Sequence, residues 1–245
     1  ESFLGYQIKV AHVEAGLRSY DRSMPEEINR FIVDHLSDFL FAPTAEEKNI
    51  LIGEGVARPW IHVTGNSIVD AVKQSIIAAE RRSRILERMG IAKSRYLLLT
   101  LHRQENVDSR LVFGGILDGL ARVMRSFKLP IVFPMHPRTA KRMEHFGLKV
   151  PGGVRVTPPL GFLDFLRLEA NAAMAFTDSG GVQEEACILR VPCVTLRNST
   201  ERPETVTVGS NVVAGTRPNG ILRAARRMAA VRSEERRVGK ECTMT

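Results

Sequence analysis

The feature that most constrains the fold of this chain is a repeated alternation of short apolar runs with longer segments of helical pattern. The apolar runs are apolar throughout rather than alternating with polar residues, which is typical of parallel strands covered by helices on both faces. The alternation therefore predicts an α/β protein with parallel sheets. The predicted strands cover residues 8–13, 38–42, 61–63, 96–101, 131–135, 154–156, 172–176, 193–196 and 212–213.

The predicted strands fall into two series on either side of residues 67–90, a helical stretch that is apolar at first and then heavily charged. We expect this stretch to link two domains, residues 1–66 and 67–231. The first series is short for a Rossmann-like domain, which usually needs roughly 100–150 residues, so we expect an N-terminal segment to be missing. Residues 232–245 lack periodicity and do not continue the last predicted helix, which predicts a non-native or disordered tail.

The stretch 177–185, Thr-Asp-Ser-Gly-Gly-Val-Gln-Glu-Glu, predicts a strand end, a tight turn and a helix start. Ser179 is placed to cap the helix, and Gly180 and Gly181 bring bare backbone N–H groups to its first turn. Unpaired N–H groups and the positive end of the helix dipole form an anion site suited to phosphate. One of the two following glutamates is placed to accept both hydroxyls of a ribose. The alternative is that the glycines only close a βα turn and the glutamates favour the dipole.

Five further polar clusters end predicted strands or open predicted helices. Taken singly, each has a structural explanation: a helix cap for His102, a turn for His136, a surface ion pair for Arg202. Together they place imidazoles, carboxylates and arginines at the carboxyl ends of two sheets, the layout expected for a nucleotide-linked substrate between two domains. The clusters are residues 12–19, 25–27, 102–106, 136–138 and 200–204.

Charge and composition exclude several other classes of protein. The net charge of +8 comes from scattered basic residues and late arginines, which fits an anionic substrate but predicts no nucleic-acid groove. No run approaches the length of a transmembrane helix and no signal-peptide pattern opens the chain, so we expect a cytoplasmic protein with no membrane partner. No spacing resembles a metal-binding helix, and the chemistry of the clusters needs neither a metal nor a cofactor.

Motifs run in order through the chain up to about residue 231. They are HVEAGLR at 12–18, MPEEINR at 24–30, TGN at 64–66, HRQEN at 102–106, TDSGGVQEE at 177–185 and TERPE at 200–204. On these motifs the chain resembles the non-hydrolysing UDP-N-acetylglucosamine 2-epimerases of bacteria and archaea, an isomerase family.

The resemblance implies the GT-B fold, two Rossmann-like domains with the active site in the cleft, of which the first is incomplete in this chain. It implies interconversion of UDP-GlcNAc and UDP-ManNAc, which supply surface polysaccharides, and a homodimer. In the implied mechanism a base removes the C2 proton of the sugar, UDP leaves from C1, and 2-acetamidoglucal stays bound. UDP then adds back while C2 is protonated on the opposite face.

The resemblance also assigns roles to single residues. Glu14, Glu26 and His102 are the acid, base and charge-handling candidates; a carboxylate is favoured as the C2 base, and the division of roles stays open. Arg103 and His136 are placed among the substrate-binding residues. The remaining roles are the diphosphate for Ser179, Gly180 and Gly181, the ribose for Glu185, the phosphates or sugar for Arg202, and the uracil for Phe165.

The chain also departs from the family pattern. The N-terminal glycine-rich loop, a further catalytic Asp and the last C-terminal helix have no counterpart in the sequence, so we expect the chain by itself to be inactive. Three alternatives stay open. Some relatives act on diacetamido-uronic acid sugars, a GT-B glycosyltransferase would share the fold and the diphosphate site, and a non-catalytic sensor would bind a UDP-sugar without turnover.

Overall fold

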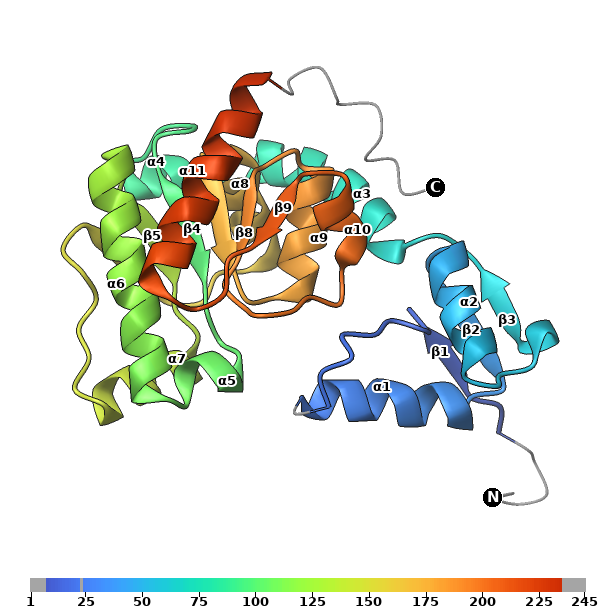
Figure 1. The fold of residues 1–245 in the computed structure, drawn as a ribbon. Coiled ribbons are helices and arrows are strands. Elements are labelled where there is room, and N and C mark those ends of the chain that lie inside the picture. Colours follow the sequence, from blue (N-terminus) through green and yellow to red (C-terminus); the bar gives the residue numbers. More distant parts are fainter. Residues whose placement is uncertain (1–7, 23, 235–245) are drawn as a thin grey trace. The chain divides into compact units, whose positions relative to one another are not determined.

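The structure, a computed structural model, describes residues 8–22 and 24–234, with the backbone alone for 231–234 (Figure 1). The chain divides into two compact units with the boundary between Asp70 and Ala71. Of the predicted tail, residues 232–234 belong to the last helix, and 235–245 lie outside the described residues.

The first unit holds a parallel sheet with the strand order β1-β2-β3. Its core forms where Leu40, Leu51 and Ile61 meet between the sheet and α2. Thr44 begins α2 with a capping box, since its side chain accepts from the helix backbone while Glu47 binds back to the Thr44 N–H. The elements are β1 (Ala11–Val13), α1 (Pro25–Leu36), β2 (Phe39–Ala42), α2 (Ala45–Gly53), a 3₁₀ turn (Arg58–Trp60), β3 (Ile61–Val63) and the start of α3 (Ser67–Arg82).

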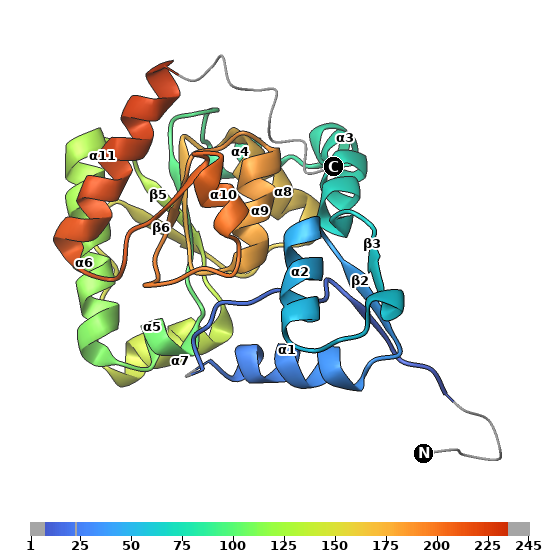
Figure 2. The same ribbon diagram turned by 45° about the vertical axis from the view of Figure 1, so that its right-hand side comes forward.

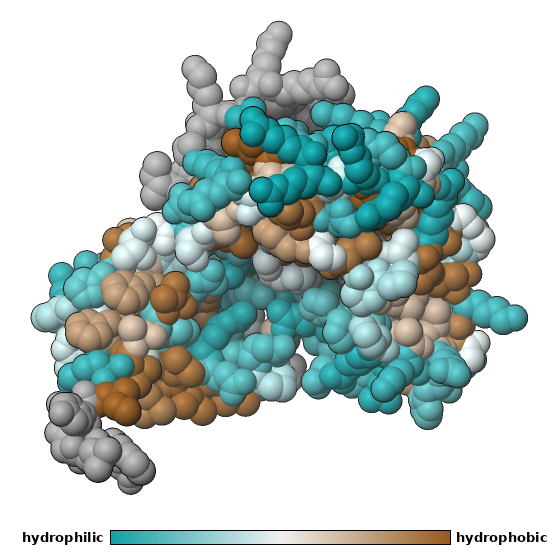
Figure 3. All heavy atoms as spheres, turned by 180° about the vertical axis from the view of Figure 1, so that it is seen from behind, coloured by the Kyte–Doolittle hydropathy of each residue, from teal (hydrophilic) through white to brown (hydrophobic). Residues whose placement is uncertain are grey.

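The apolar stripe of α1 is exposed. Ile28, Phe31, Ile32 and Leu36 recur at helical spacing, as the sequence predicts for a buried face, yet each is between 46% and 73% exposed. Hydrophobic side chains gather over this part of the molecule, at the lower left of Figure 3. Within the described residues, the apolar cluster of this unit therefore forms with α2, and the apolar stripe of α1 takes no part in it.

The second unit holds a parallel sheet with the strand order β6-β5-β4-β7-β8-β9. The chain enters at the centre with β4, moves outward through β5 and β6, and then crosses to β7 on the other side of β4. This is the doubly wound Rossmann order, with its topological switch point between β4 and β7. The strands are β4 (Leu97–Thr100), β5 (Ile131–Pro134), β6 (Val154–Thr157), β7 (Met174–Thr177), β8 (Cys193–Thr195) and β9 (Asn211–Val213).

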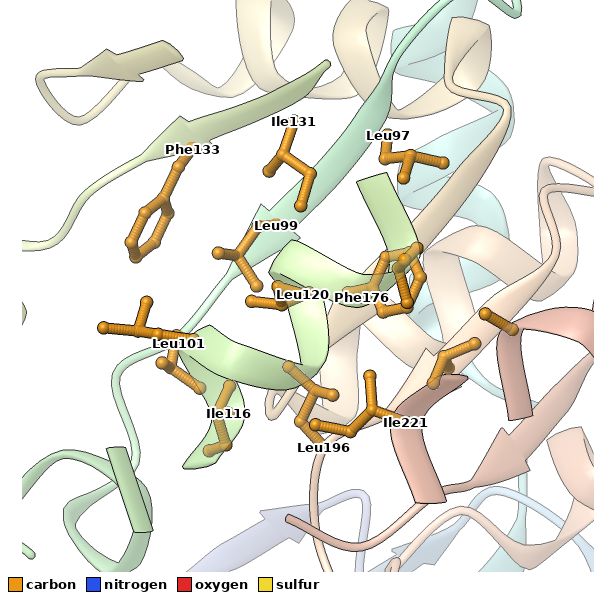
Figure 4. Packing of buried hydrophobic residues seen from close by; sticks show 14 of the residues in the cluster. Leu97, Leu99, Leu101, Ile116, Leu120, Ile131, Phe133, Phe176, Leu196 and Ile221 are labelled. Atoms are coloured by element: carbon orange, nitrogen blue, oxygen red, sulfur yellow. The ribbon is translucent and has the colours of Figure 1, made fainter. Parts of the chain in front are cut away.

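Successive residues of the central strands enter opposite core layers. Leu97 and Leu99 belong to one core cluster with Leu120 and Ile221, in which Figure 4 shows Leu99 next to Leu120, while Leu98 belongs to the cluster on the other face. Gly119 allows α6 and α11 to pack closely, because a Cβ there would lie 2.8 Å from Ile221 Cδ1. Helices cover both faces (Figure 2): α6 (Arg110–Phe127), α7 (Pro137–His145) and α11 (Pro218–Glu234) on the first, α4 (Ile85–Met89), α8 (Phe162–Asn171) and α9 (Gly180–Ile188) on the other.

The predicted single helix over 67–90 is wrong, since the structure breaks it into α3 and α4. Ser83 lies at the break. Its hydroxyl accepts from the Ile85 N–H and donates to Asp164 of α8, so a side chain replaces the backbone bonds that a continuous helix would make. Two short helices also begin within the polar clusters 102–106 and 200–204, α5 (Gln104–Val107) and α10 (Pro203–Thr207).

Candidate functional site

The candidate site of the second unit lies where the sheet reverses direction. β4 and β7 pair in parallel from Leu97 with Met174 to Thr100 with Thr177, so both strands end at the same edge. The hydroxyls of Thr100 and Thr177 are 2.5 Å apart and close the pair. Crevices at such switch points hold the ligands of open α/β sheets.

Asp178 organises this edge. Its buried carboxylate accepts from the backbone N–H groups of His102 at 3.0 Å and Arg103 at 2.8 Å, and from the Asn106 side chain at 3.1 Å. The same Asn106 amide donates to the Leu196 carbonyl after β8. A single carboxylate therefore fixes the loop after β4 against the turn before α9.

The two predicted histidines of this unit lie near one another. The rings of His102 and His136 have centroids 6.3 Å apart, and His102 Nδ1 is 3.6 Å from Asp178 Oδ1 with the ring 40% exposed. His136 also caps α7, because its Nδ1 accepts from the Arg138 N–H at 3.2 Å. The structural role of His136 is thus a helix cap rather than the predicted turn, and both rings are at least partly exposed to solvent.

The first turn of α9 is the place where the sequence predicts an anion site. Ser179 is the N-cap residue, as predicted, but within the described part of the chain its side chain makes no capping hydrogen bond. Its own N–H donates to Thr177 Oγ1 at 2.9 Å, which sets the turn. The helix thus begins at Gly180 without a side-chain cap from Ser179, and N–H groups of a first helical turn have no partner within the helix.

Gly180 is required by the close approach of a buried carboxylate. A Cβ at this position would lie 2.5 Å from Glu201 Oε1. Glu201 is held in place by Arg197, with Nη1 at 2.6 Å from Oε2, and by Arg103, with Nη2 at 3.5 Å from Oε1. Arg103 is therefore joined to the α9 turn through Glu201.

The structure separates the two glutamates of α9. Glu184 is buried, and its Oε2 lies 2.8 Å from Arg202 Nε, so the predicted surface role for Arg202 is wrong. Glu185 is partly exposed, and burial raises the pKa of its carboxyl. Phe165 on α8 is partly buried and packs against the core layer under α8 and α9.

In the first unit, Glu14 follows β1 in a left-handed backbone conformation, with φ 64°. A residue other than glycine rarely adopts this conformation, and such strain clusters at functional positions. Asp34 supports the turn: it accepts from the Gly16 N–H, pairs with Arg18 at 2.7 Å, and lies 2.6 Å from His12 Nδ1. The turn that presents Glu14 is thus held by a buried ion-paired carboxylate.

The adjacent glutamates of α1 have different environments. Glu26 is exposed in the first turn of the helix. Glu27 is buried and accepts from the N–H and hydroxyl of Ser19 and from the Tyr20 N–H. Glu27 therefore ties the preceding loop to α1, and this leaves Glu26 as the glutamate of the pair that faces solvent.

Sequence reasoning assigned no role to Asp178, Glu201 or Glu169, all buried carboxylates of the second unit. The position of Asp178, directly after a predicted strand and before two glycines, was the available signal. Glu169 lies in an ordinary helical pattern that gives none. The described residues contain no group of three His, Cys, Asp or Glu side chains able to hold a metal ion, and no helix among them is long and apolar enough to cross a membrane.

The chain is similar to known proteins along nearly all of its length. A sequence model of the family described as UDP-N-acetylglucosamine 2-epimerase matches residues 4–242. The UDP-N-acetylglucosamine 2-epimerase of Methanococcus maripaludis is 47% identical over 227 residues, which are 90% of this chain and 62% of that protein. The UDP-2,3-diacetamido-2,3-dideoxy-D-glucuronate 2-epimerase of Pseudomonas aeruginosa is 38% identical over 220 residues, 89% of this chain and 60% of that protein.

A solved structure shows the same likeness. The Methanocaldococcus jannaschii UDP-GlcNAc 2-epimerase in complex with UDP-GlcNAc and UDP is 48% identical, with a TM-score of 0.87 over 91% of this chain and 62% of that one. The predicted fold class is confirmed: α/β, with two Rossmann-like parallel sheets of the GT-B type. The chain spans about 62% of the length of the Methanococcus relative.

Proposed function

The chain belongs to the UDP-N-acetylglucosamine 2-epimerase family, and on that premise we propose that the protein containing it interconverts UDP-GlcNAc and UDP-ManNAc. The proposed reaction eliminates UDP and adds it back through 2-acetamidoglucal, without a cofactor. The product would supply surface polysaccharides. This chain would supply the nucleotide-binding unit of such an enzyme.

The observation that carries the proposal is the convergence of the His102 loop and the α9 turn at the switch point of the second sheet. Asp178 joins them through the backbone of His102 and Arg103. An imidazole is thereby fixed beside a helix N-terminus whose first turn holds two glycines. A departing diphosphate needs this combination, because charge develops on it as the C1–O bond breaks.

We assign the nucleotide to the second unit. Ser179, Gly180 and Gly181 would hold the diphosphate, with Arg202 and Arg103 supplying positive charge beside it. Glu185 would accept the ribose hydroxyls, because Glu184 is buried against Arg202 and Glu185 is the partly exposed glutamate. Phe165 would lie against the uracil, and His136 would contact the substrate next to His102.

We assign the proton transfers to carboxylates and to His102. The C2 proton is weakly acidic, so its base must be a carboxylate whose basicity rises by partial loss of water. Glu14 and Glu26 are the candidates, and the strained backbone of Glu14 favours it. His102 would protonate or stabilise the leaving diphosphate.

The test is incubation of the complete protein that contains this chain with UDP-GlcNAc in deuterated water. An epimerase of this mechanism incorporates deuterium at C2 of the sugar and forms UDP-ManNAc. A GT-B glycosyltransferase would leave C2 unlabelled, and a sensor would bind the nucleotide sugar without turnover. Either of the last two results would contradict the proposal.

A second candidate substrate is a UDP-diacetamido-uronic acid sugar, favoured by the 38% identity to the Pseudomonas enzyme named for that substrate. UDP-GlcNAc is preferred, because the relatives named for it reach 47% and 48% identity. Parallel assays with both nucleotide sugars decide between them through the ratio of the kcat/KM values. The expected homodimer and the cytoplasmic location stay predictions, of which the first is checked by sedimentation equilibrium.

A further inference from the structure

A carboxyl group is buried behind the proposed ribose ligand. Glu169 lies on α8 with no exposed surface, next to Leu168, in the layer where α8, α9 and β8 meet. It interacts with the Glu185 carboxyl of α9 and with the Cys193 thiol of β8. Within the described residues, neither oxygen of Glu169 accepts from an N–H or O–H donor. The carboxyl of Glu185 is therefore the group that can bind it, provided the two share a proton.

The physical chemistry of such a pair favours one proton. Two adjacent carboxylates that are both ionised repel each other, and burial penalises the charge of each. Burial raises the pKa of Glu169 well above the usual range, with the Glu185 charge as a further cause, and it raises that of Glu185. Since Glu169 is the fully buried partner, it holds the proton, and Glu185 carries the charge.

We propose that Glu169 is a positioning residue for the ribose site: its protonated carboxyl donates to the Glu185 carboxylate and fixes that side chain where the ribose hydroxyls bind. This inference rests on the proposed role of Glu185 as the ribose ligand. Phe165, assigned to the uracil, is four residues before Glu169 and therefore on the same side of α8. One helix face would thus support both halves of the nucleoside.

The shared proton also limits the negative charge beside a diphosphate. Glu184 is neutralised by Arg202, and the Glu169–Glu185 pair carries a single negative charge. Among the described residues buried in this layer, the Cys193 thiol and the Tyr96 hydroxyl can also titrate, but burial raises the pKa of each, so both stay neutral. Arg167 of α8 pairs with Glu80 at 3.5 Å.

The test compares binding of UDP and 2′-deoxy-UDP to this chain by titration calorimetry. If Glu185 binds the ribose, the wild type prefers UDP, and Glu185→Gln weakens that preference. Glu169→Gln keeps the preference, because its amide N–H still donates to Glu185. Glu169→Met, similar in size but without a donor, reduces the preference by about tenfold or more, as expected for a lost bond to a charged group.

A second readout is the pH dependence of the preference for UDP over 2′-deoxy-UDP, which a purely structural role of Glu169 would not produce. Raising the pH removes the shared proton, so the wild-type preference for UDP over 2′-deoxy-UDP falls. Glu169→Gln shows no such fall, because its amide does not titrate. The ratio of the two affinities cancels the titration of the diphosphate itself. The comparison of the wild type with Glu169→Gln across pH therefore tests the role of Glu169 even if Glu169→Met does not fold.

The possible failures are distinguishable. A wild type that binds no UDP overturns the proposed nucleotide site and this inference together. A wild type that binds UDP and 2′-deoxy-UDP equally overturns the ribose role of Glu185, and with it the inference. A UDP preference that Glu185→Gln weakens, but that Glu169→Met and high pH leave intact, overturns the inference alone.

Discussion

The Asp178 carboxylate accepts a hydrogen bond from the His102 backbone N–H at 3.0 Å, and this contact joins the loop after β4 to the turn before α9. His102 lies at the edge of the sheet just after β4, and the glycine turn lies at the same edge just after β7, the strand that pairs with β4. Asp178 is fully buried and accepts from two backbone N–H groups of this loop and from Asn106, so its function is to hold the two segments together. The proposed imidazole and diphosphate positions depend on this one side chain.

Asp178→Asn is expected to destabilise the second unit by about 2 kcal/mol or more, because the amide offers fewer acceptor sites and leaves a buried N–H unsatisfied. Urea unfolding measures the change, and UDP affinity should fall with it. The control is Asp118→Asn, which removes an exposed pair with Arg122 on α6 and should cost well under about 1 kcal/mol. Equal effects of the two changes would contradict the role assigned to Asp178.

Gly180→Ala and Gly181→Ala form a matched pair in the same helical turn. A Cβ at Gly180 would lie 2.5 Å from Glu201 Oε1, whereas at Gly181 the nearest atom is Ser179 Oγ at 4.0 Å. We expect Gly180→Ala to cost about 1–3 kcal/mol through overpacking. Gly181→Ala should be neutral or slightly stabilising, because alanine favours a helix. Thermal unfolding of both variants is the measurement, and a reversed order would rule out the steric explanation.

The Arg202–Glu184 pair allows structure and binding to be separated. Arg202→Met alone should cost about 3–5 kcal/mol, because it strands the buried Glu184 charge. The double variant Arg202→Met, Glu184→Met should regain most of that stability. If Arg202 binds the phosphates, the UDP affinity of the double variant stays well below that of the wild type although its stability recovers. Recovery of both stability and UDP affinity would assign Arg202 a structural role only.

Glu14→Gln tests the proposed base in the complete protein. We expect turnover to fall by about 10²–10⁴-fold, the usual contribution of a general base, while UDP affinity stays unchanged. Steady-state kinetics and calorimetry measure the two quantities. Glu46→Gln, an exposed glutamate in the first turn of α2, is the control and should change neither. Loss of UDP affinity together with turnover would indicate a structural role for Glu14.

The raised pKa of Glu169 predicts a pH dependence of stability. Because the folded state holds this proton more tightly than the unfolded chain, the folded protein gains stability below the usual glutamate pKa and loses it as pH rises through the raised value. Glu169→Gln removes that term. The free energy of unfolding of the wild type minus that of Glu169→Gln should therefore decrease as pH rises from about 4.5, near the usual glutamate pKa, towards neutrality. A constant difference would show that Glu169 does not titrate on unfolding.

The local sequence pattern predicted most helices and strands but not every residue at which they begin or end. Ser179 is the N-cap residue of α9, as the sequence predicts, but its side chain does not make the expected capping bond in the described structure. The long helix over 67–90 breaks at Ser83, where the hydroxyl finds Asp164 in another part of the chain. A partner 81 residues away leaves no signal in local periodicity.

The candidate site was only partly predictable for a related reason. The family motifs predict roles for His102, Ser179 and Glu185, and apolar patterns place these residues at a strand end or a helix start; the roles themselves stay predictions. Whether Arg202 is a surface ion pair or a buried one depends on its distance from Glu184, which lies on another helix. The choice between Glu184 and Glu185 as ribose ligand rests on the same contact.

By itself the sequence determined the two series of parallel strands, the glycine turn after β7 and the family motifs, because each arises from residues close together along the chain. Only the tertiary structure decided that β4 and β7 lie side by side, that Asp178 holds the His102 loop, and that Glu169 is buried against Glu185. These contacts join distant segments, and their strength depends on burial and exclusion of water, which exist only once the sheet is formed.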